Sequence, residues 1–260
     1  MAINPLIANL QKNKLEIDPS IGKWFRFYRE SYDWPSGTGR KESELKIRDL
    51  QSSIQLAIID RNNQNFAVSL EEIHRWKNGN QRDISCKYRK NLDMKGSKYI
   101  SDILGLAPFD NTENLSNLIR KLKISGCNLP TCSAIASFIY NRKDVPIIDR
   151  FIAQFFARKF QKDTVDEETA RILQYVKKIP FTLQDDGKGK LRPAVYYSAG
   201  FEDNLSKYID MLIPECSRIA QDLLRINIQY CDIDEHLTYF SPVDVEMAIF
   251  SYAMKHSGDF

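Results

Sequence analysis

The spacing of apolar residues constrains the fold of this chain more than any other feature. Apolar residues recur at i, i+3, i+4 and i+7 through many stretches, which is the period of an amphipathic helix. Period-two alternation, which is typical of a half-buried strand, is scarce. We therefore predict an all-α fold. The predicted helices cover Glu44–Ile59, Ser69–Trp76, Leu115–Leu122, Ala134–Ile139, Arg150–Phe160, Asp166–Lys178, Leu205–Leu212, Cys216–Ile226 and Pro242–Met254.

Local signals for helix starts and for breaks support several of these ranges. Capping residues Asp110–Thr112 precede Leu115, Ser69 opens another helix, and Ser241-Pro242 precedes the last apolar run. Turn-rich polar segments at Trp34–Arg40 and Gln184–Pro193 predict breaks between helices.

Length and composition exclude several classes of protein. With 260 residues, 43% of them hydrophobic and 27% charged, the chain is an ordinary globular protein that can bury a core. No apolar run approaches the roughly 18 residues of a membrane span, and the first residues lack the order of a signal peptide. The five cysteines include no CxxC pair, which argues against a disulfide framework or a zinc ribbon. We expect a soluble intracellular protein with no membrane contact.

Charge is distributed unevenly along the chain. Residues 201–260 carry 4 basic and 11 acidic side chains, which leaves +10 on residues 1–200 of a chain whose net charge is +3. The stretches His74–Ile100 and Leu118–Phe160 each have eight basic and two acidic residues. A concentrated basic surface predicts a polyanionic partner, because each neutralised phosphate releases counterions. A solvated Lys/Arg face is the alternative interpretation.

The most specific segment runs LKISGCNLPTCSAIASFIY over Leu122–Tyr140 and continues as VPIIDRFIAQFF from Val145. An amphipathic helix ends at a Gly-containing turn, and Pro130 opens the next helix, where its missing N–H costs nothing. This predicts a helix-hairpin-helix, whose turn amides can bind phosphate whatever the base sequence. Asp149 then stands at the start of another helix, where a carboxylate can also act simply as a cap.

These residues resemble the helix-hairpin-helix DNA glycosylase superfamily (endonuclease III-like), whose hairpin reads roughly Leu-Pro-Gly-Val-Gly-x-Lys-Thr-Ala and leads to Val-Asp or Leu-Asp. The hairpin glycines correspond to Gly126 and Asn128, the lysine to Pro130 and the catalytic aspartate to Asp149. Val145-Pro-Ile-Ile-Asp149 is similar to the Phe-Pro-Ile-Leu-Asp of the mispaired-adenine glycosylases. Weaker similarities around Glu72–Lys77 and near the end of the chain point to poorly characterised members.

The resemblance covers about 40 residues and implies a single glycosylase-like region over 1–260. It implies two helical subdomains with the active-site cleft between them. We expect the central subdomain at about 69–160, with the hairpin at 115–140 and Asp149. Residues 1–68 and 161–260 are expected to form the flanking subdomain, which includes the acidic C-terminal segment.

Two hairpin positions depart from the family pattern. Asn128 replaces the second glycine, and Asn tolerates the left-handed conformation, which would preserve the turn. Pro130 replaces the lysine whose amine, in bifunctional members, attacks the sugar C1′ and forms a Schiff base. The chain thus resembles the monofunctional branch, and we expect no lyase activity. Lys123 and Lys143 flank the hairpin and are the amines that could substitute.

The reaction implied is hydrolysis of the N-glycosidic bond of a damaged, mismatched or modified base in double-stranded DNA. The base is flipped out of the stack, and Asp149 stabilises the positive charge that develops on the sugar and directs a water. The basic loop His74–Gly79 could wedge into the duplex. DNA contacts are predicted at Ser125, Gly126, Cys127, Asn128, Thr131, Lys121, Lys123, Arg142, Lys143, Arg150, Arg75 and Lys77.

No cofactor is expected. Only Cys216 and Cys231 follow Asp149, so the four-cysteine iron–sulfur cluster of some members should be absent. The resemblance leaves room for a monovalent cation at the hairpin, and His236 and His256 have no neighbours at metal-ligand spacing. Helical spacing predicts that the aromatic residues of Trp24–Trp34 pack in the core, with base stacking as the alternative.

Three functions remain open. The preferred one is a monofunctional DNA N-glycosylase in base excision repair, located in the cytoplasm with the nucleoid or in the nucleus. The second is a helix-hairpin-helix protein that binds DNA without excising bases, in which Asp149 is only a helix cap. The third is an all-α adaptor whose acidic C-terminal segment binds a protein partner.

Overall fold

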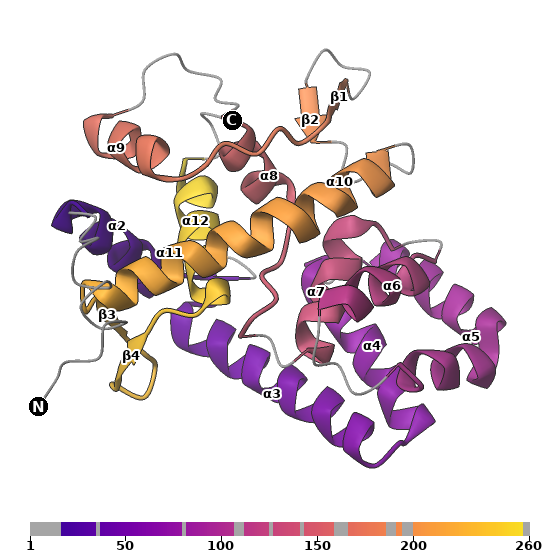
Figure 1. Ribbon diagram of the computed structural model, residues 1–260. Helices are drawn as coiled ribbons and strands as arrows, with labels where there is room; N and C mark the ends of the chain where they lie inside the picture. The colour runs from indigo at the N-terminus through magenta and orange to yellow at the C-terminus, as the bar shows by residue number, and fades with distance from the viewer. Residues whose placement is uncertain are drawn as a thin grey trace, which may run out of the picture.

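The computed structural model describes residues 17–34, 37–79, 82–106, 112–124, 127–140, 143–158, 166–185, 191–193 and 200–256. It is mostly helical, which confirms the all-α prediction (Figure 1). Among the described residues, no helix is both long and apolar enough to span a membrane. The helices are α2 (Pro19–Glu30), α3 (Arg40–Ile59), α4 (Asn63–Lys77), α5 (Arg82–Leu104), α6 (Thr112–Leu122), α7 (Leu129–Ile139), α8 (Arg150–Ala157), α9 (Glu167–Tyr175), α10 (Phe201–Lys207), η3 (Tyr208–Leu212), α11 (Ile213–Arg225) and α12 (Pro242–Lys255).

In the described part of the chain, two short antiparallel strand pairs accompany the helices. β1 (Leu183–Asp185) pairs with β2 (Leu191–Pro193), and β3 (Gln229–Cys231) pairs with β4 (Leu237–Tyr239). The first pair occupies the predicted break at 184–193. Three-residue strands are too short to show a period-two pattern, which is why the sequence did not indicate them.

Side-chain caps set the starts of several helices. Ser241 caps α12, as the sequence predicts, and Asp244 completes a capping box with it. The predicted start at Ser69 is wrong, because α4 begins six residues earlier. The Asn62 side chain accepts the Asn65 amide at 3.0 Å, and Ser69 is buried within the helix. The first turn of α4 is polar, so apolar spacing does not reveal it.

Helix ends and two whole helices also differ from the predicted ranges. α8 ends at Ala157 because Arg158 takes a left-handed conformation with φ 60°, so the predicted end at Phe160 is wrong. α2 and α5 lie outside the predicted ranges. α5 is only weakly amphipathic and bends at Gly96, whose φ is 71°. The spacing of apolar residues therefore did not predict this helix.

α10, η3 and α11 form one continuous helix where the sequence predicts two (Figure 1). η3 is a π-helical turn in which the Ile213 amide donates to the Tyr208 carbonyl, five residues back. Pro214 follows directly. Its ring has no N–H and would crowd the carbonyl four residues earlier, and the wider turn accommodates it without ending the helix.

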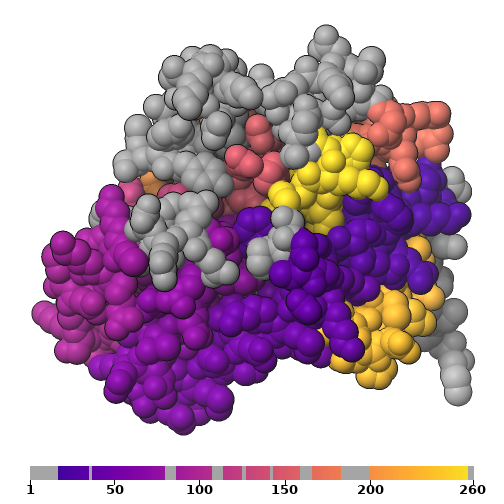
Figure 2. Space-filling view, turned by 180° about the vertical axis from the view of Figure 1, so that it is seen from behind, coloured from indigo at the N-terminus to yellow at the C-terminus, as the bar shows by residue number. Residues whose placement is uncertain are grey.

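The helices pack in two groups. α4 packs against α3, α5 and α7, and α6 packs against α7, whereas α12 packs against α2, α8 and α11. Seen from behind, α3–α5 form one side of the molecule, and α2 with α12 lie beside them (Figure 2). The sequence analysis expects residues of α3 in the flanking subdomain. In the structure, α3 packs against α4 and α7. The link 143–149 joins the two groups.

The aromatic cluster near the N-terminus is divided between core and surface. Trp24, Phe25 and Tyr32 are buried, as helical spacing predicts, and the Trp24 ring lies 5.3 Å from the ring of Tyr252 in α12. Phe27 is 54% exposed. Trp24 therefore helps to hold α2 against α12.

Candidate active site

Residues 145–149, in the link between α7 and α8, are buried and position Asp149. The Ile148 amide donates to the Ser133 hydroxyl of α7 at 3.2 Å. The Tyr208 hydroxyl, in the π-helical turn, donates to the Pro146 carbonyl at 2.6 Å. Burial raises the pKa of Tyr208 well above its ordinary value of 10.0, so the hydroxyl remains a donor. Residues from both groups of helices thus hold the segment that precedes Asp149.

Asp149 is a buried carboxylate at the start of α8. Its Oδ1 atom accepts the Ile152 amide at 2.9 Å, which is the helix cap that the sequence predicts. Its Oδ2 atom lies 3.5 Å from Nζ of Lys77, the last residue of α4. The residue is 5% exposed. One carboxylate oxygen is therefore occupied by the cap, and the other meets an amine.

Arg75 and Lys77, expected in a basic loop at His74–Gly79, both lie in the last turn of α4 and differ in exposure. The Lys77 side chain is 11% exposed and turns inward to Asp149. Arg75 is exposed, donates to Glu71 at 2.8 Å and borders a cavity of about 390 Å³ together with Trp76. No local pattern could have found the contact of Lys77 with Asp149, because the two residues are 72 positions apart.

The turn between α6 and α7 differs from the expected geometry at Asn128. This residue has φ −96° and ψ 178°, so the expected left-handed conformation is wrong. Asn128 instead caps α7, and its Oδ1 atom accepts the amide of Thr131 at 3.2 Å and the Thr131 hydroxyl at 3.0 Å. An N-cap requires an extended backbone, which explains the difference. The cap also occupies an amide that a phosphate would otherwise use.

Two further hairpin residues that were predicted to contact DNA have buried side chains. Thr131 is 1% exposed, and Cys127 is 6% exposed, with its Sγ 3.4 Å from Sγ of Cys132. Burial raises the pKa of Cys127 well above its ordinary value. These side chains pack within the hairpin. Ser125 and Gly126, two of the predicted DNA contacts in this turn, lie outside the described residues. The monovalent cation at the hairpin stays a prediction.

The other predicted basic contacts are exposed and lie over different elements. Lys121 is exposed. Nζ of Lys123 lies 3.9 Å from the ring centre of Phe201 in α10. The Arg150 guanidinium lies over the ring of Phe151. Arg142 lies outside the described residues.

An aromatic group lies close to Asp149 in the fold. Phe151, two residues later, packs edge-on against Phe250 of α12 at 6.0 Å, and Trp34 packs against the same ring at 5.6 Å. The Trp34 Nε1 donates to the Trp76 carbonyl at 3.3 Å, next to Lys77. Trp34 is half-buried.

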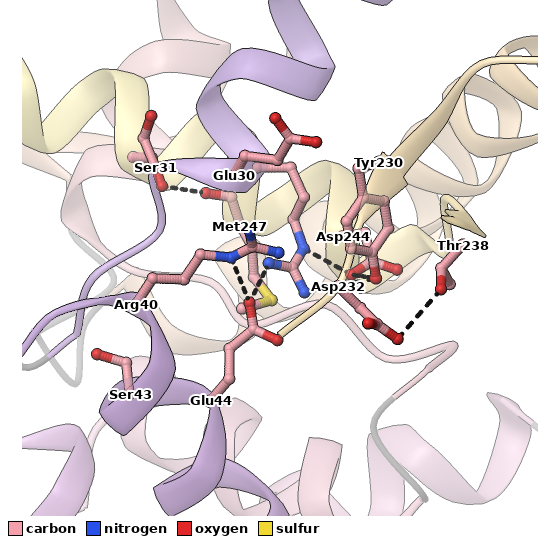
Figure 3. Close-up of polar contacts among 12 residues, drawn as sticks. Glu30, Ser31, Arg40, Ser43, Glu44, Tyr230, Asp232, Thr238, Asp244 and Met247 are labelled. Atoms are coloured by element: carbon pink, nitrogen blue, oxygen red, sulfur yellow. Dashed lines mark hydrogen bonds and ion pairs between the residues drawn. The ribbon is translucent and has the colours of Figure 1, made fainter. Parts of the chain in front are cut away.

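A cavity of about 480 Å³ lies between α3, the β3–β4 pair and the start of α12, and Lys143 is the one predicted site residue on its wall. Part of the wall is an ion network. Arg29 donates to Glu44 and Asp244, both at 2.7 Å. The Tyr230 hydroxyl donates to Asp244 at 2.9 Å. Figure 3 shows Glu44, Tyr230 and Asp244 of this network. The sequence analysis did not indicate this network.

His236 has neighbours that the sequence analysis did not expect. Atoms of Asp232, Asp234 and His236 that could ligate a metal lie within 4.8 Å of one another in the β3–β4 turn. Asp232 accepts the amides of the other two residues at 2.9 Å, and Asp234 pairs with Arg48 at 2.6 Å. These hydrogen bonds and this ion pair explain why the three residues lie close together in the turn.

The chain matches no family model, no curated protein and no solved structure. Functional inference therefore depends on the site itself.

Proposed function

We propose that this protein is a DNA N-glycosylase of the helix-hairpin-helix type, in which α6 and α7 form the hairpin and Asp149 is the catalytic carboxylate. The reaction is hydrolysis of the N-glycosidic bond of a damaged, mismatched or modified base. The observation that carries the proposal is the placement of Asp149. It is a buried carboxylate, fixed at a helix start by its own cap and by a link bonded to Ser133 and Tyr208.

This arrangement suits the charge that develops in the reaction. Cleavage of the bond leaves positive charge on the sugar, and a fixed anion in a site of low dielectric constant stabilises that charge more than a solvated one does. The cap uses Oδ1 of Asp149, so Oδ2, which faces the Lys77 amine at 3.5 Å, is the oxygen proposed for this role and for directing a water. Trp34, a half-buried residue, is the aromatic side chain on which we propose that a flipped base stacks.

A second candidate function is DNA binding through the hairpin without base removal. The cap at Asp149 favours it, because the bond to Ile152 would serve a purely structural residue equally well. In such a protein the carboxylate has no catalytic role, and its cap and its ion pair with Lys77 are purely structural.

The substitution Asp149→Asn separates the two candidates. Asn is as good an N-cap as Asp, so the variant keeps the helix start and loses the charge. We expect base release to fall by at least about 100-fold, the scale of a lost transition-state contact, with DNA affinity nearly unchanged. The measurement uses duplex oligonucleotides with a panel of damaged, mismatched and modified bases, and alkali reveals the abasic sites.

Asp166→Asn is a matched control. Asp166 caps α9 by accepting the Thr169 amide at 2.7 Å, but it belongs to another helix. This variant should release bases as the wild type does. Equal activity of the wild type and Asp149→Asn would contradict the proposed role of Asp149, and binding without any base release would support the second candidate.

A further inference from the structure

The cavity between α3, the β3–β4 pair and the start of α12 is a part of the molecule that the proposed reaction does not use. Its volume is about 480 Å³, which is within the range of small-molecule sites, and Asp149 is not on its wall. α3 supplies Gln51 to the wall, α12 supplies Met247, and the link between the two groups of helices supplies Lys143. A ligand in this cavity would therefore contact both groups and the link.

The acidic side chains on the wall are already neutralised by the protein. Asp244 accepts Arg29 at 2.7 Å through one oxygen and the Ser241 hydroxyl at 2.6 Å through the other. Glu44 accepts Arg29 at 2.7 Å and Arg40 at 3.0 Å. Two guanidinium groups thus balance two carboxylates, so this network adds no net charge to the cavity and leaves no need for a cationic ligand.

Two other cations on the same wall are available to a ligand. Lys143 is exposed, and its amine has no partner among the residues that the structure describes. Arg48 pairs with Asp234 at 2.6 Å, and the two side chains are 46% and 50% exposed. An exposed pair of this kind contributes at most about 1 kcal/mol, so Arg48 can turn to an anion at little cost. Two positive charges match the dianion of a phosphate monoester.

The wall also has features that a phosphate group alone would not use. Nε2 of Gln51 donates to the Phe138 carbonyl at 2.9 Å, which leaves Oε1 as an acceptor. This oxygen is buried and has no partner within the described part of the chain. A buried acceptor without a donor costs about 1–3 kcal/mol, so the wall favours a ligand that carries an N–H or O–H group. Met247 adds a thioether, which makes favourable contacts with aromatic rings.

We propose that this cavity binds a nucleoside monophosphate, with the phosphate at Lys143 and Arg48 and the base between α3 and α12. A nucleotide combines the dianion, the aromatic ring and the N–H or O–H donors that the wall accommodates. The same chemistry is present in a free nucleotide and at the phosphorylated 5′ end of a DNA strand, and the test separates these two sources. The site is distinct from Asp149 and does not depend on the proposed reaction.

Isothermal titration calorimetry with the full chain tests the proposal. The probes are the four deoxynucleoside 5′-monophosphates, the matching nucleosides and inorganic phosphate. At least one monophosphate should bind about 10-fold or more tightly than its nucleoside and than phosphate, because each of those probes lacks one set of contacts. Lys143→Ala should weaken binding about 10–100-fold, since it removes a charge-assisted hydrogen bond. Ser52→Trp, at an exposed position of α3 on the wall, should abolish binding by filling the cavity. Lys255→Ala, at the opposite end of α12, should bind as the wild type does.

Each outcome decides for or against the site. No binding of any monophosphate at millimolar concentration overturns the proposal, and so does binding that persists in both Lys143→Ala and Ser52→Trp. Inorganic phosphate that binds as tightly as the nucleotides overturns the nucleotide assignment. An oligonucleotide whose affinity rises with a 5′ phosphate in the wild type, but not in Ser52→Trp, supports the site and identifies a DNA end as the source. Binding of free nucleotides without that rise supports the site and identifies a free nucleotide. Base release enters none of these measurements, so failure here leaves the proposed function intact.

Discussion

Arg29 is a single side chain that joins several elements of the fold. It is 4% exposed in α2 and pairs with Glu44 of α3 and Asp244 of α12. Burial alone would raise the pKa of Asp244, but Arg29 and the Ser241 cap outweigh it and hold that pKa below 3.8. The carboxylate therefore stays ionised inside the protein. A buried charge network of this kind tolerates the loss of a member poorly, because the remaining charges lose their compensation.

Arg29→Gln should lower the free energy of unfolding by about 3–5 kcal/mol, because Asp244 is then left buried without its cation. Urea denaturation measures the change. Arg26→Gln is the matched control on the same helix. Its ion pair with Glu30 is 51% exposed on the arginine side, so its loss should cost at most about 1 kcal/mol. If both substitutions lowered the free energy of unfolding by the same amount, burial would not be the reason that the ion pairs of Arg29 stabilise the protein.

Among the elements, the π-helical turn η3 contacts the segment that precedes the candidate site. Pro214 favours the wide turn, and the turn carries Tyr208, whose hydroxyl bonds to Pro146. Pro146 precedes Asp149 by three residues in the link. The position of the carboxylate thus depends on a helix that is distant in sequence.

Tyr208→Phe should lower the free energy of unfolding by about 1–3 kcal/mol, because it leaves the Pro146 carbonyl buried without a donor. Base release should fall while DNA affinity is retained, since the link is loosened but the basic surface is not changed. Tyr239→Phe removes a comparable hydroxyl, which donates to Asn227 at 2.8 Å, from a residue that is 43% exposed. That control should alter neither property. A stable Tyr208→Phe protein with normal base release would refute the positioning role.

Across the whole molecule, buried ion pairs explain part of the uneven distribution of charge along the sequence. The acidic excess of residues 201–260 includes four buried side chains. Asp222 pairs with Arg218 and Arg225, Glu215 pairs with Arg218, and Asp244 pairs with Arg29. These carboxylates stabilise the fold and do not add to an acidic surface, which weakens the argument for a protein-binding acidic segment. The fourth buried residue is Glu246.

A basic surface that binds DNA predicts a strong dependence on salt. The logarithm of the association constant for undamaged duplex should fall linearly with the logarithm of salt concentration, by about 0.9 for each phosphate neutralised, and should depend little on sequence. Lys121→Ala should make the slope shallower by about one. Fluorescence anisotropy with labelled duplexes measures both. A flat salt response would favour the adaptor function.

The sequence alone predicted the properties that arise within one element. Apolar period and capping residues indicated most of the helices, and Ser241 and Asp149 cap helices where they were expected to do so. These predictions succeed because helix hydrogen bonds and caps join residues within about four positions of one another. Where the local signal was weak, as in the bent and weakly amphipathic α5, the prediction failed.

Only the tertiary structure decided which elements meet. It placed the Lys77 amine against Asp149, the Tyr208 hydroxyl against Pro146, and Arg29 between two carboxylates. These partners are separated by between 15 and 215 positions. Such contacts depend on the packing and relative orientation of whole helices, which the period of each helix leaves undetermined. The candidate carboxylate was therefore visible in the sequence, whereas the groups that hold it and face it were not.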